Sequence, residues 1–392
     1  MQFRSTRKYN NEELNLLKKR FIQIQECYIN RLKNKNYHLE IPIAIGLKLT
    51  NRCNLRCKHC FEWNNDGYHN LLDSEYLSIN GDLKFDLIKE LILNTKMTSA
   101  PIYLWGGEPT VYKHWDELIN LLSVEDRKVI ICTNGIGLDS KLESISKLRN
   151  NVTLLFSIEG FKNEHDYLRG KGSFQKTMES LKLYLTKQRN KEFLGLISVE
   201  TVISDQLIPH LFEYCNYIED LGLDTLFLNF PWYINRKEVD KMDLYYEKTF
   251  SNIFSTNQKH YSWYSFDFHI SPSSFECLKN ELSYINKKNW KNHIIVQPNF
   301  SDYDEMINYL RGDNIIVGNK NMCLAYSLRI DVMPNGDVIP CKKFPEFVVG
   351  NLNESSFNDV WNGTRFNYFR EQMNNNLMNI CSKCELLYAY GK

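Results

Sequence analysis

The feature that most constrains this chain of 392 residues is a run of three closely spaced cysteines. Cys53, Cys57 and Cys60 have the spacing C-x3-C-x2-C, which brings three thiols into one short loop. A [4Fe–4S] cluster is normally held by four thiolates, one for each iron. Three thiolates therefore leave one iron free to bind another molecule. Zinc also accepts Cys and His ligands at such spacings, so a zinc site is an alternative interpretation of these cysteines alone.

The three cysteines follow a predicted strand. Residues 43–50 are mostly apolar and are typical of a buried strand, and Cys53 comes directly after them. Barrels of the α/β class place functional groups in the loops at the carboxyl ends of parallel strands. At this point the chain resembles the radical S-adenosylmethionine (SAM) superfamily, whose signature is C-x3-C-x2-C after the first barrel strand. The resemblance implies that these cysteines hold a [4Fe–4S] cluster and that SAM binds the open iron. One electron then cleaves SAM to a 5′-deoxyadenosyl radical.

A second motif supports the same resemblance. Residues 101–105 are typical of a buried strand, and Gly106, Gly107, Glu108 and Pro109 follow it. Glycines let the backbone come close to a small ligand, and a carboxylate accepts hydrogen bonds from an ammonium group. The segment is similar to the superfamily's motif for the methionyl amino group of SAM, which implies that these four residues contact SAM.

Other candidate SAM contacts lie after further predicted strands. The resemblance places Thr133 and Asn134 near the nucleoside and places Ser157 and Arg169 at the SAM carboxylate or ribose. His59 stands at the family's usual aromatic position, where the backbone touches the adenine. A Ser or Asn at a strand end is more often a turn residue, whereas an arginine side chain matches a carboxylate with two hydrogen bonds.

The strand pattern predicts the fold class. Further strands are expected at 128–133, 152–157, 195–202 and 224–230, with helical periodicity between them. Six alternating strands and helices predict an α/β fold with a partial (β/α)6 TIM-like barrel, open on one side. The predicted division of the chain has four parts, namely a helical extension (1–40), the barrel (41–232), a bridging region (233–318) and a cluster domain (319–392).

Two of these parts carry specific expectations. Residues 11–35 predict an amphipathic helix that packs against the barrel. Its apolar face would contain Leu14, Leu17, Phe21, Ile24, Tyr28 and Leu32. The bridging region is rich in aromatic residues and either covers the open side of the barrel, in contact with substrate, or forms a helical spacer with surface aromatics.

The C-terminal part contains a second group of cysteines. Cys323 and Cys341 flank a predicted hairpin over residues 333–340, and Cys381 and Cys384 form a C-x2-C pair. Four thiolates could complete an iron–sulfur cluster or a structural zinc site. The region resembles the SPASM and twitch domains of radical SAM enzymes. Because the full SPASM pattern has three more cysteines after the last pair, the resemblance implies one auxiliary [4Fe–4S] cluster, as in the shorter twitch form.

Four of the eleven cysteines remain, and most free cysteines are small buried apolar side chains. They are Cys27, Cys132, Cys215 and Cys277. Cys215 and Cys277 are candidate hydrogen donors to a substrate radical. The spacing singles out no acid or base among His165, Asp166, Glu200, Asp331 and Asp337.

Composition excludes some classes of partner. The 48 basic and 47 acidic residues give a net charge of +1, so bulk charge does not favour a nucleic-acid partner. No apolar run is long enough to cross a membrane, and the polar start is not a signal peptide. Thiolate clusters need a reducing compartment, which predicts a cytoplasmic protein. The resemblance also implies a reducing partner of the flavodoxin or ferredoxin type.

The predicted function is radical SAM modification of a ribosomally synthesised precursor peptide by epimerisation, crosslinking or oxidation. The stretch 159–174 and the cysteine-rich C-terminal part are similar to those of peptide-modifying members. One alternative is a dehydrogenase or epimerase of a small molecule such as a sugar or aminocyclitol. Another alternative is a maturase of a folded partner enzyme, and a zinc-stabilised binding module is the non-catalytic hypothesis.

Overall fold

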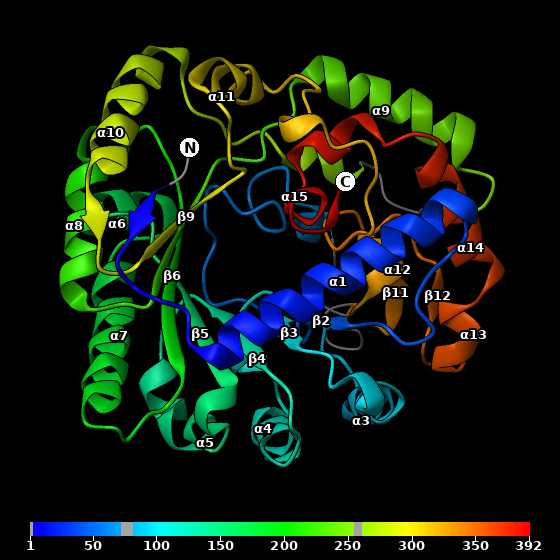
Figure 1. The fold of residues 1–392 in the computed structure, drawn as a ribbon, viewed down its shortest axis with the longest axis horizontal. Coiled ribbons are helices and arrows are strands. Elements are labelled where there is room, and N and C mark those ends of the chain that lie inside the picture. The colour runs from blue at the N-terminus through cyan, green and yellow to red at the C-terminus, as the bar shows by residue number, and fades with distance from the viewer. Residues whose placement is uncertain (1–2, 72–80, 255–260) are drawn as a thin grey trace.

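The computed structural model describes residues 3–71, 81–254 and 261–392. A ten-stranded sheet lies at its centre, in the order β12-β11-β10-β2-β3-β4-β5-β6-β7-β9 (Figure 1). Its strands are β2 (Ala44–Lys48), β3 (Ile102–Trp105), β4 (Val129–Thr133), β5 (Val152–Ser157), β6 (Leu196–Val202), β7 (Thr225–Asn229), β9 (His293–Gln297), β10 (Arg329–Val332), β11 (Asp337–Ile339) and β12 (Gly350–Asn351). The strands from β10 through β9 pair in parallel, and β11 and β12 add an antiparallel edge.

The structure confirms the α/β class and all six predicted barrel strands, each within two residues of its expected ends. Helices follow these strands and cover the outer side of the curved sheet (Figure 1). They are α3 (Phe85–Asn94), α4 (Trp115–Ser123), α5 (Leu142–Ser146), α6 (Lys162–Arg169), α7 (Ser173–Arg189) and α8 (Leu211–Leu221). The apolar side of each longer helix is buried against the strands, as the 3.6-residue periodicity predicts.

Four strands from outside the predicted barrel extend its sheet, and two of them pair directly with barrel strands. In the bridging region, β9 pairs with β7, and in the C-terminal part, β10 pairs with β2. The sheet is therefore wider than the six predicted strands, and the expected boundaries at residues 232 and 319 do not coincide with its edges. The predicted hairpin after β10 is confirmed, since β10 and β11 are antiparallel.

Most aromatic side chains described in the bridging region are buried or half-buried, whereas Tyr284 is exposed. The region contains α9 (Arg236–Thr249), α10 (Phe275–Lys287) and α11 (Tyr303–Leu310). Tyr246, Phe250 and Trp263 are almost fully buried, and they make stacked, tilted and edge-to-face contacts with neighbouring rings. The expectation of a spacer with surface aromatics is therefore wrong, because these rings form a core between the bridging region and the C-terminal part.

The N-terminal helix forms as predicted, but it buries a different face. A capping box of Asn10 and Glu13 begins α1 (Asn11–Lys33), and its buried residues are Ile24, Cys27 and Arg31. Four of the six residues predicted to face the core are exposed, namely Leu14, Leu17, Phe21 and Leu32. The Arg31 guanidinium instead donates hydrogen bonds to Ser327 and Asn374, so α1 packs on the C-terminal part.

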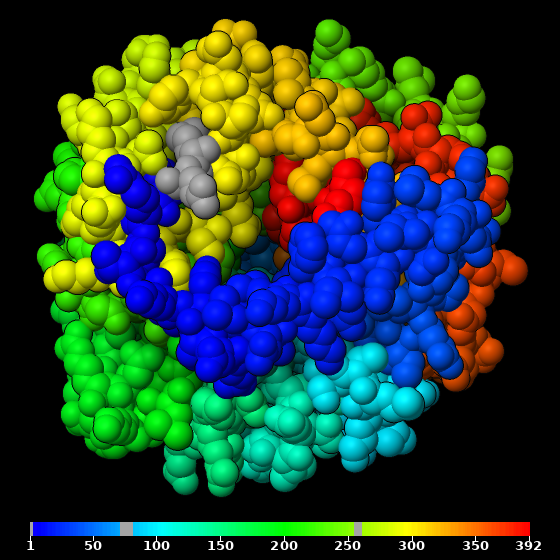
Figure 2. Space-filling view, in the orientation of Figure 1, coloured from blue at the N-terminus to red at the C-terminus, as the bar shows by residue number. Residues whose placement is uncertain are grey.

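The remaining elements complete the C-terminal part and a small outlying sheet. They are α12 (Ala325–Leu328), α13 (Phe357–Trp361), α14 (Thr364–Asn375), α15 (Glu385–Tyr390) and the pair β1 (Arg4–Ser5) and β8 (Asn289–Trp290). Figure 2 shows α1 crossing one face of the molecule, beside a hollow that leads inward between α1, the C-terminal segment and the bridging region. Within the described ranges, no helix has the length and apolar character needed to cross a bilayer.

Candidate functional site

The loop with the first three cysteines is attached to the end of the neighbouring strand by backbone hydrogen bonds. The amide of Gly107 donates to the carbonyl of Thr50 (2.8 Å), and the amide of Glu108 donates to that of Arg52 (2.9 Å). A Cβ atom on Gly106 would lie 2.5 Å from the Thr50 carbonyl, and one on Gly107 would overlap Arg52. The two glycines were expected to make room for a small ligand. The neighbour that requires them is the cysteine loop itself.

The carboxylate of Glu108 joins the ends of β3 and β4. It accepts hydrogen bonds from the Thr133 hydroxyl (2.8 Å), the Asn134 amide (2.7 Å) and the Thr110 hydroxyl (2.8 Å). Burial raises the pKa of Glu108, and these hydrogen bonds act in the opposite direction. The Asn134 side chain also donates to Asn54 in the cysteine loop (2.7 Å). The predicted SAM contacts from these two strand ends therefore lie together beside the cysteines.

A second group of predicted residues lies on the other side of the cysteine loop. The Arg169 guanidinium donates to Glu159 through Nε (2.9 Å) and Nη2 (2.5 Å), and its Nη1 lies 3.8 Å from the Cys57 sulfur. His59 Nε2 lies 3.3 Å from the same carboxylate. Burial alone would raise the pKa of Glu159, but the Arg169 charge and His59 hold it well below its usual range. Arg169 is thus fixed as a cation beside a cysteine sulfur.

The three-cysteine loop has the surroundings that an anionic cluster requires. Burial raises the pKa of Cys53 and Cys60 to about 12, so their thiolates need a positive partner such as iron. Arg169 lies beside Cys57, and the fully buried Lys48 ammonium, paired with Glu62 (2.6 Å), lies near Cys60. The residues present therefore fit a cluster bound by three thiolates.

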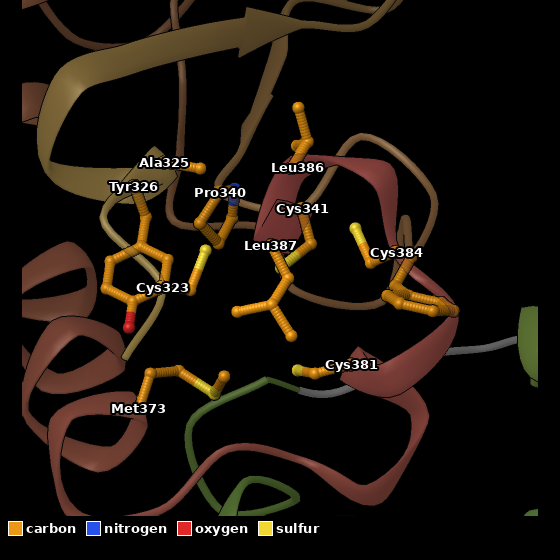
Figure 3. A pocket seen from close by; sticks show the side chains of 11 residues that line it. Cys323, Ala325, Tyr326, Pro340, Cys341, Met373, Cys381, Cys384, Leu386 and Leu387 are labelled. Atoms are coloured by element: carbon orange, nitrogen blue, oxygen red, sulfur yellow. The ribbon is translucent and has the colours of Figure 1, made fainter. Parts of the chain in front are cut away.

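The four C-terminal cysteines line one pocket. Figure 3 shows Cys323, Cys341, Cys381 and Cys384 around a common space, into which Leu387 also points. Its other walls are mainly apolar side chains, and the backbone of Cys323 bridges to Gly391 at the end of the chain. Within the described ranges, no three His, Cys, Asp or Glu side chains converge closely enough for a single metal ion. A cubane cluster does not need its ligands to converge on one point, because each thiolate binds a different iron.

Of the four remaining cysteines, Cys27 and Cys215 are buried, as expected, whereas Cys132 is partly exposed and Cys277 is exposed. Cys215 is fully buried on the outer helix α8, and Cys277 is exposed on α10. Both lie on outer helices and neither faces the inside of the barrel, so the structure lends no support to either as the predicted hydrogen donor. Cys132 on β4 does face the inside, where it contacts Glu200 of β6. In the sequence, the only indication that Cys132 lies near the site is its position in the strand, one residue before the predicted SAM contact Thr133.

Most of the acid–base candidates are held by structural contacts. His165 accepts a hydrogen bond from the Glu159 amide, and Asp166 accepts from the Gly172 and Phe174 amides in the next loop. Asp331 forms a buried ion pair with Arg329, and Asp337 accepts from Asn335 and Asn351 in the hairpin. Glu200 is the candidate that faces the barrel interior, as does Ser157, its neighbour in the β5–β6 register.

Comparison with known proteins gives two matching family descriptions. Residues 47–215 match the radical SAM superfamily, and residues 323–385 match the SPASM iron–sulfur cluster-binding domain. The first matched range contains the three-cysteine loop and every predicted SAM contact. The second begins at Cys323 and includes all four cysteines of the pocket. The two families therefore account for the two groups of cysteines separately.

The matches to individual relatives extend over different shares of this chain and of each relative. SkfB of Bacillus subtilis, the sporulation killing factor maturation protein, is 33% identical over 36% of this chain and 32% of its own length. AlbA of the same organism, the antilisterial bacteriocin subtilosin biosynthesis protein, is 23% identical over 82% of this chain and 60% of its own. A third relative, from Pyrococcus furiosus, is the cofactor-modifying protein of tungsten-containing aldehyde ferredoxin oxidoreductase. It is 24% identical over 87% of this chain and 86% of its own length. This chain thus spans about a third of SkfB and three fifths of AlbA.

Among solved structures, SuiB of Streptococcus suis bound to S-adenosylmethionine shares the fold. Its TM-score is 0.53 at 17% identity, over 91% of this chain and 72% of that one. SuiB has also been solved bound to its precursor peptide SuiA, with a TM-score of 0.53. Fold, cysteine placement and family matches agree. The chain therefore contains a radical SAM domain, which implies a [4Fe–4S] cluster and SAM as cofactors, and a C-terminal SPASM iron–sulfur cluster-binding domain.

Proposed function

We propose that this radical SAM enzyme abstracts hydrogen from a ribosomally synthesised peptide and thereby epimerises, crosslinks or oxidises one of its residues. The observation that carries the proposal is a polar barrel interior next to both groups of cysteines. Among the described residues, β12 and β9 are the sheet edges and do not pair with each other. An extended peptide can reach the interior of such an open barrel without any strand separating.

The names of several relatives support a peptide substrate. SkfB is a maturation protein for a killing factor, AlbA takes part in subtilosin biosynthesis, and SuiB has been solved with a precursor peptide. These proteins share the fold or part of the sequence with this chain. Their substrates favour a peptide over a sugar or an aminocyclitol for this chain as well.

The residues described above have separate tasks in this proposal. Cys53, Cys57 and Cys60 would hold the SAM-binding cluster, which, with SAM bound, supplies a 5′-deoxyadenosyl radical. Glu108 fixes the ends of β3 and β4, so that Thr133 and Asn134 present a rigid surface to the nucleoside. Arg169, held by Glu159, offers a positive charge beside Cys57 for the SAM carboxylate.

The C-terminal cysteines have a different task. Cys323, Cys341, Cys381 and Cys384 would hold one auxiliary [4Fe–4S] cluster in the apolar pocket, where it would supply one-electron transfer. The Lys342 ammonium, next to Cys341 in the chain, lies 4.9 Å from the ring centre of Tyr103 on β3. The auxiliary pocket is thus connected to the barrel interior through neighbouring side chains. A reducing partner of the flavodoxin or ferredoxin type would supply the electrons.

The test uses the full chain, reconstituted with iron and sulfide under anaerobic conditions. It is incubated with SAM, a reductant and a synthetic peptide encoded by the nearest short reading frame. The proposal predicts more 5′-deoxyadenosine with the peptide than without it, together with a mass or chiral change in the peptide. A variant with Ala at Cys53, Cys57 and Cys60 should give neither. An unchanged peptide, with no rise in 5′-deoxyadenosine, contradicts the peptide substrate.

A second candidate function is the maturation of a folded partner enzyme. The Pyrococcus furiosus relative favours it, because that match covers most of both chains and its name describes modification of an enzyme's cofactor. The same assay distinguishes the two candidates when the proteins encoded beside the gene are added in place of the peptide. Stimulation by a folded protein, but not by the peptide, supports this second candidate.

A further inference from the structure

A row of polar side chains crosses the inner face of the barrel. It consists of Tyr103 on β3, Cys132 on β4, Glu200 on β6 and Asn229 on β7. The Tyr103 hydroxyl is an electrostatic neighbour of the Cys132 thiol. The thiol in turn donates to Glu200 Oε2 (3.9 Å), and the Asn229 amide donates to Glu200 Oε1 (2.5 Å). Cys132, Glu200 and Asn229 therefore form one connected hydrogen-bonded chain, with Tyr103 as its neighbour.

The Cys132–Glu200 contact shows on which side of the sheet this row lies. Strands β4 and β6 are not neighbours, because β5 pairs with both of them. Two side chains separated by a whole strand can meet only across the concave face of the sheet. Along β4, Cys132 is partly exposed whereas Ile131 and Thr133 are buried, as the two-residue periodicity of a strand requires. The thiol therefore opens into the barrel interior.

The position of the thiol relates it to the predicted SAM contacts. Its neighbour in the strand, Thr133, donates to Glu108 in the Gly-Gly-Glu-Pro segment. Ser157, another predicted SAM contact, pairs in register with Glu200. The row thus begins where SAM is expected and continues toward β7, on the side of the open edge.

The surroundings keep Cys132 as a neutral thiol. Burial, followed by the nearby Glu200 carboxyl, raises its pKa to about 12, so the S–H bond is intact at neutral pH. A thiolate would be a metal ligand or a nucleophile, whereas a thiol can give up a hydrogen atom. Burial also raises the pKa of Glu200, which favours a carboxyl able to return a proton.

We propose that Cys132 donates a hydrogen atom to a carbon radical in the barrel interior and that Glu200 returns a proton to its sulfur. The C–H bond forms as the S–H bond breaks, which leaves a sulfur-centred radical on Cys132. One electron from the flavodoxin- or ferredoxin-type reductant and one proton from Glu200 restore the thiol. Glu200 then takes a proton from solvent. The substrate keeps its oxidation level, so this inference narrows the proposed function to a redox-neutral change such as epimerisation.

The inference rests on the radical SAM assignment and not on the identity of the substrate, so it can be tested without one. The reconstituted full chain is incubated in D2O with SAM and titanium(III) citrate, and the 5′-deoxyadenosine is analysed by mass spectrometry. Without substrate, the adenosyl radical takes hydrogen from the nearest donor in the protein. If that donor is the Cys132 thiol, which exchanges with solvent, the product carries one deuterium.

Three variants make the result specific. Cys132→Ser keeps the size of the side chain but has a stronger O–H bond, so the deuterated fraction of the product should fall to background. Cys215→Ala, which removes a thiol outside the barrel interior, should keep the wild-type fraction. Glu200→Gln should keep the label in the first turnover and lose it in later turnovers, because the thiol is not restored.

Iron content and SAM binding of each variant check that it has folded. Unlabelled product from the wild type, or a label that persists in Cys132→Ser, overturns the proposal. Loss of the label in Tyr103→Phe together with its persistence in Cys132→Ser would assign the donor role to Tyr103 instead. Each of these outcomes is independent of whether a peptide is the substrate.

Discussion

The Nη1 atom of Arg169 lies 3.8 Å from the sulfur of Cys57, and the other nitrogens of the same guanidinium are held by Glu159. Glu159 is in turn fixed by the Val202 amide (2.6 Å) at the end of β6. The arginine therefore has a fixed orientation before any ligand binds. Such preorganisation is what a group that orients a cofactor requires.

Replacement of Arg169 tests its predicted contact with the SAM carboxylate. Arg169→Lys keeps a positive charge but loses the planar pair of donors. A hydrogen bond to a charged group is worth about 1.5–3 kcal/mol, so we expect the Kd for SAM to rise by about 10-fold or more. Anaerobic equilibrium dialysis measures this Kd. The control is Arg236→Lys, at the exposed ion pair with Asp240, which should leave the Kd unchanged. An unchanged Kd in Arg169→Lys would refute the contact between Arg169 and the SAM carboxylate.

Glu108→Gln tests the hydrogen bonds by which Glu108 links the ends of β3 and β4. The carboxylate accepts from Thr133 and Asn134 with different oxygens, so an amide NH2 must face one donor. A buried donor left without an acceptor costs about 1–3 kcal/mol, and we expect a lower Tm by thermal unfolding. Glu117→Gln, at an exposed site on α4, is the matched control. The same Tm for both variants and the wild type would show that the Glu108 hydrogen bonds between β3 and β4 do not stabilise the fold.

Cys341→Ala tests the auxiliary site. If its pocket holds a [4Fe–4S] cluster, the reconstituted variant should contain up to about four fewer iron atoms per chain. The SAM-dependent spectroscopic change of the first cluster should remain. Cys27→Ala removes a buried cysteine outside both groups and should lose no iron. Zinc in the wild-type pocket, or full iron content in Cys341→Ala, contradicts the auxiliary cluster.

Lys48 and Glu62 form a buried ion pair next to the cysteine loop, with Tyr68 donating to the same carboxylate (2.7 Å). Removal of one partner of such a pair leaves an uncompensated buried charge and costs about 3–5 kcal/mol. We therefore expect Lys48→Met to unfold at clearly lower urea concentration. The double variant Lys48→Met/Glu62→Gln should recover part of the loss. A double variant no more stable than the single one would contradict this explanation.

Glu346 predicts a specific pH dependence of stability. Burial raises its pKa to about 7, and its carboxyl accepts from the Ser262 amide and hydroxyl. Between the unfolded pKa near 4.5 and about 7, the folded state binds the extra proton, so its contribution to stability falls as pH rises. Glu346→Gln should therefore be more stable than wild type at pH 8, by at most about 3 kcal/mol, with little difference below pH 4.5. Urea unfolding at both pH values measures the two free energies of unfolding. The same difference between variant and wild type at both pH values would refute the predicted pH dependence.

The sequence predicted the six inner strands because each is a short run of apolar or β-branched residues that ends in a polar loop. It did not predict that β9 and β10 extend the sheet. Those pairings join residues far apart in the chain, and the short, mixed runs of β9 and β10 show no partner locally. The buried face of α1 was predicted wrongly for a related reason. Arg31 is buried because Ser327 and Asn374 accept its hydrogen bonds, and no periodicity reveals such partners.

The candidate site was predicted to the level of its motifs. Spacing identified the cysteines, and the structure brings Cys323, Cys341, Cys381 and Cys384 to one pocket. The role of Cys132 could not be inferred, because two-residue periodicity alone does not say which side of a strand faces the interior. That side is fixed by the contact with Glu200, which crosses an intervening strand.

The most direct test of the central claim measures 5′-deoxyadenosine after anaerobic reconstitution, with SAM and a strong reductant. Wild type is compared with the variant that has Ala at Cys53, Cys57 and Cys60. A radical SAM enzyme with this cysteine loop forms 5′-deoxyadenosine in the wild type and none in the variant. Equal product from both, or zinc in place of iron and no product from the wild type, would contradict the account.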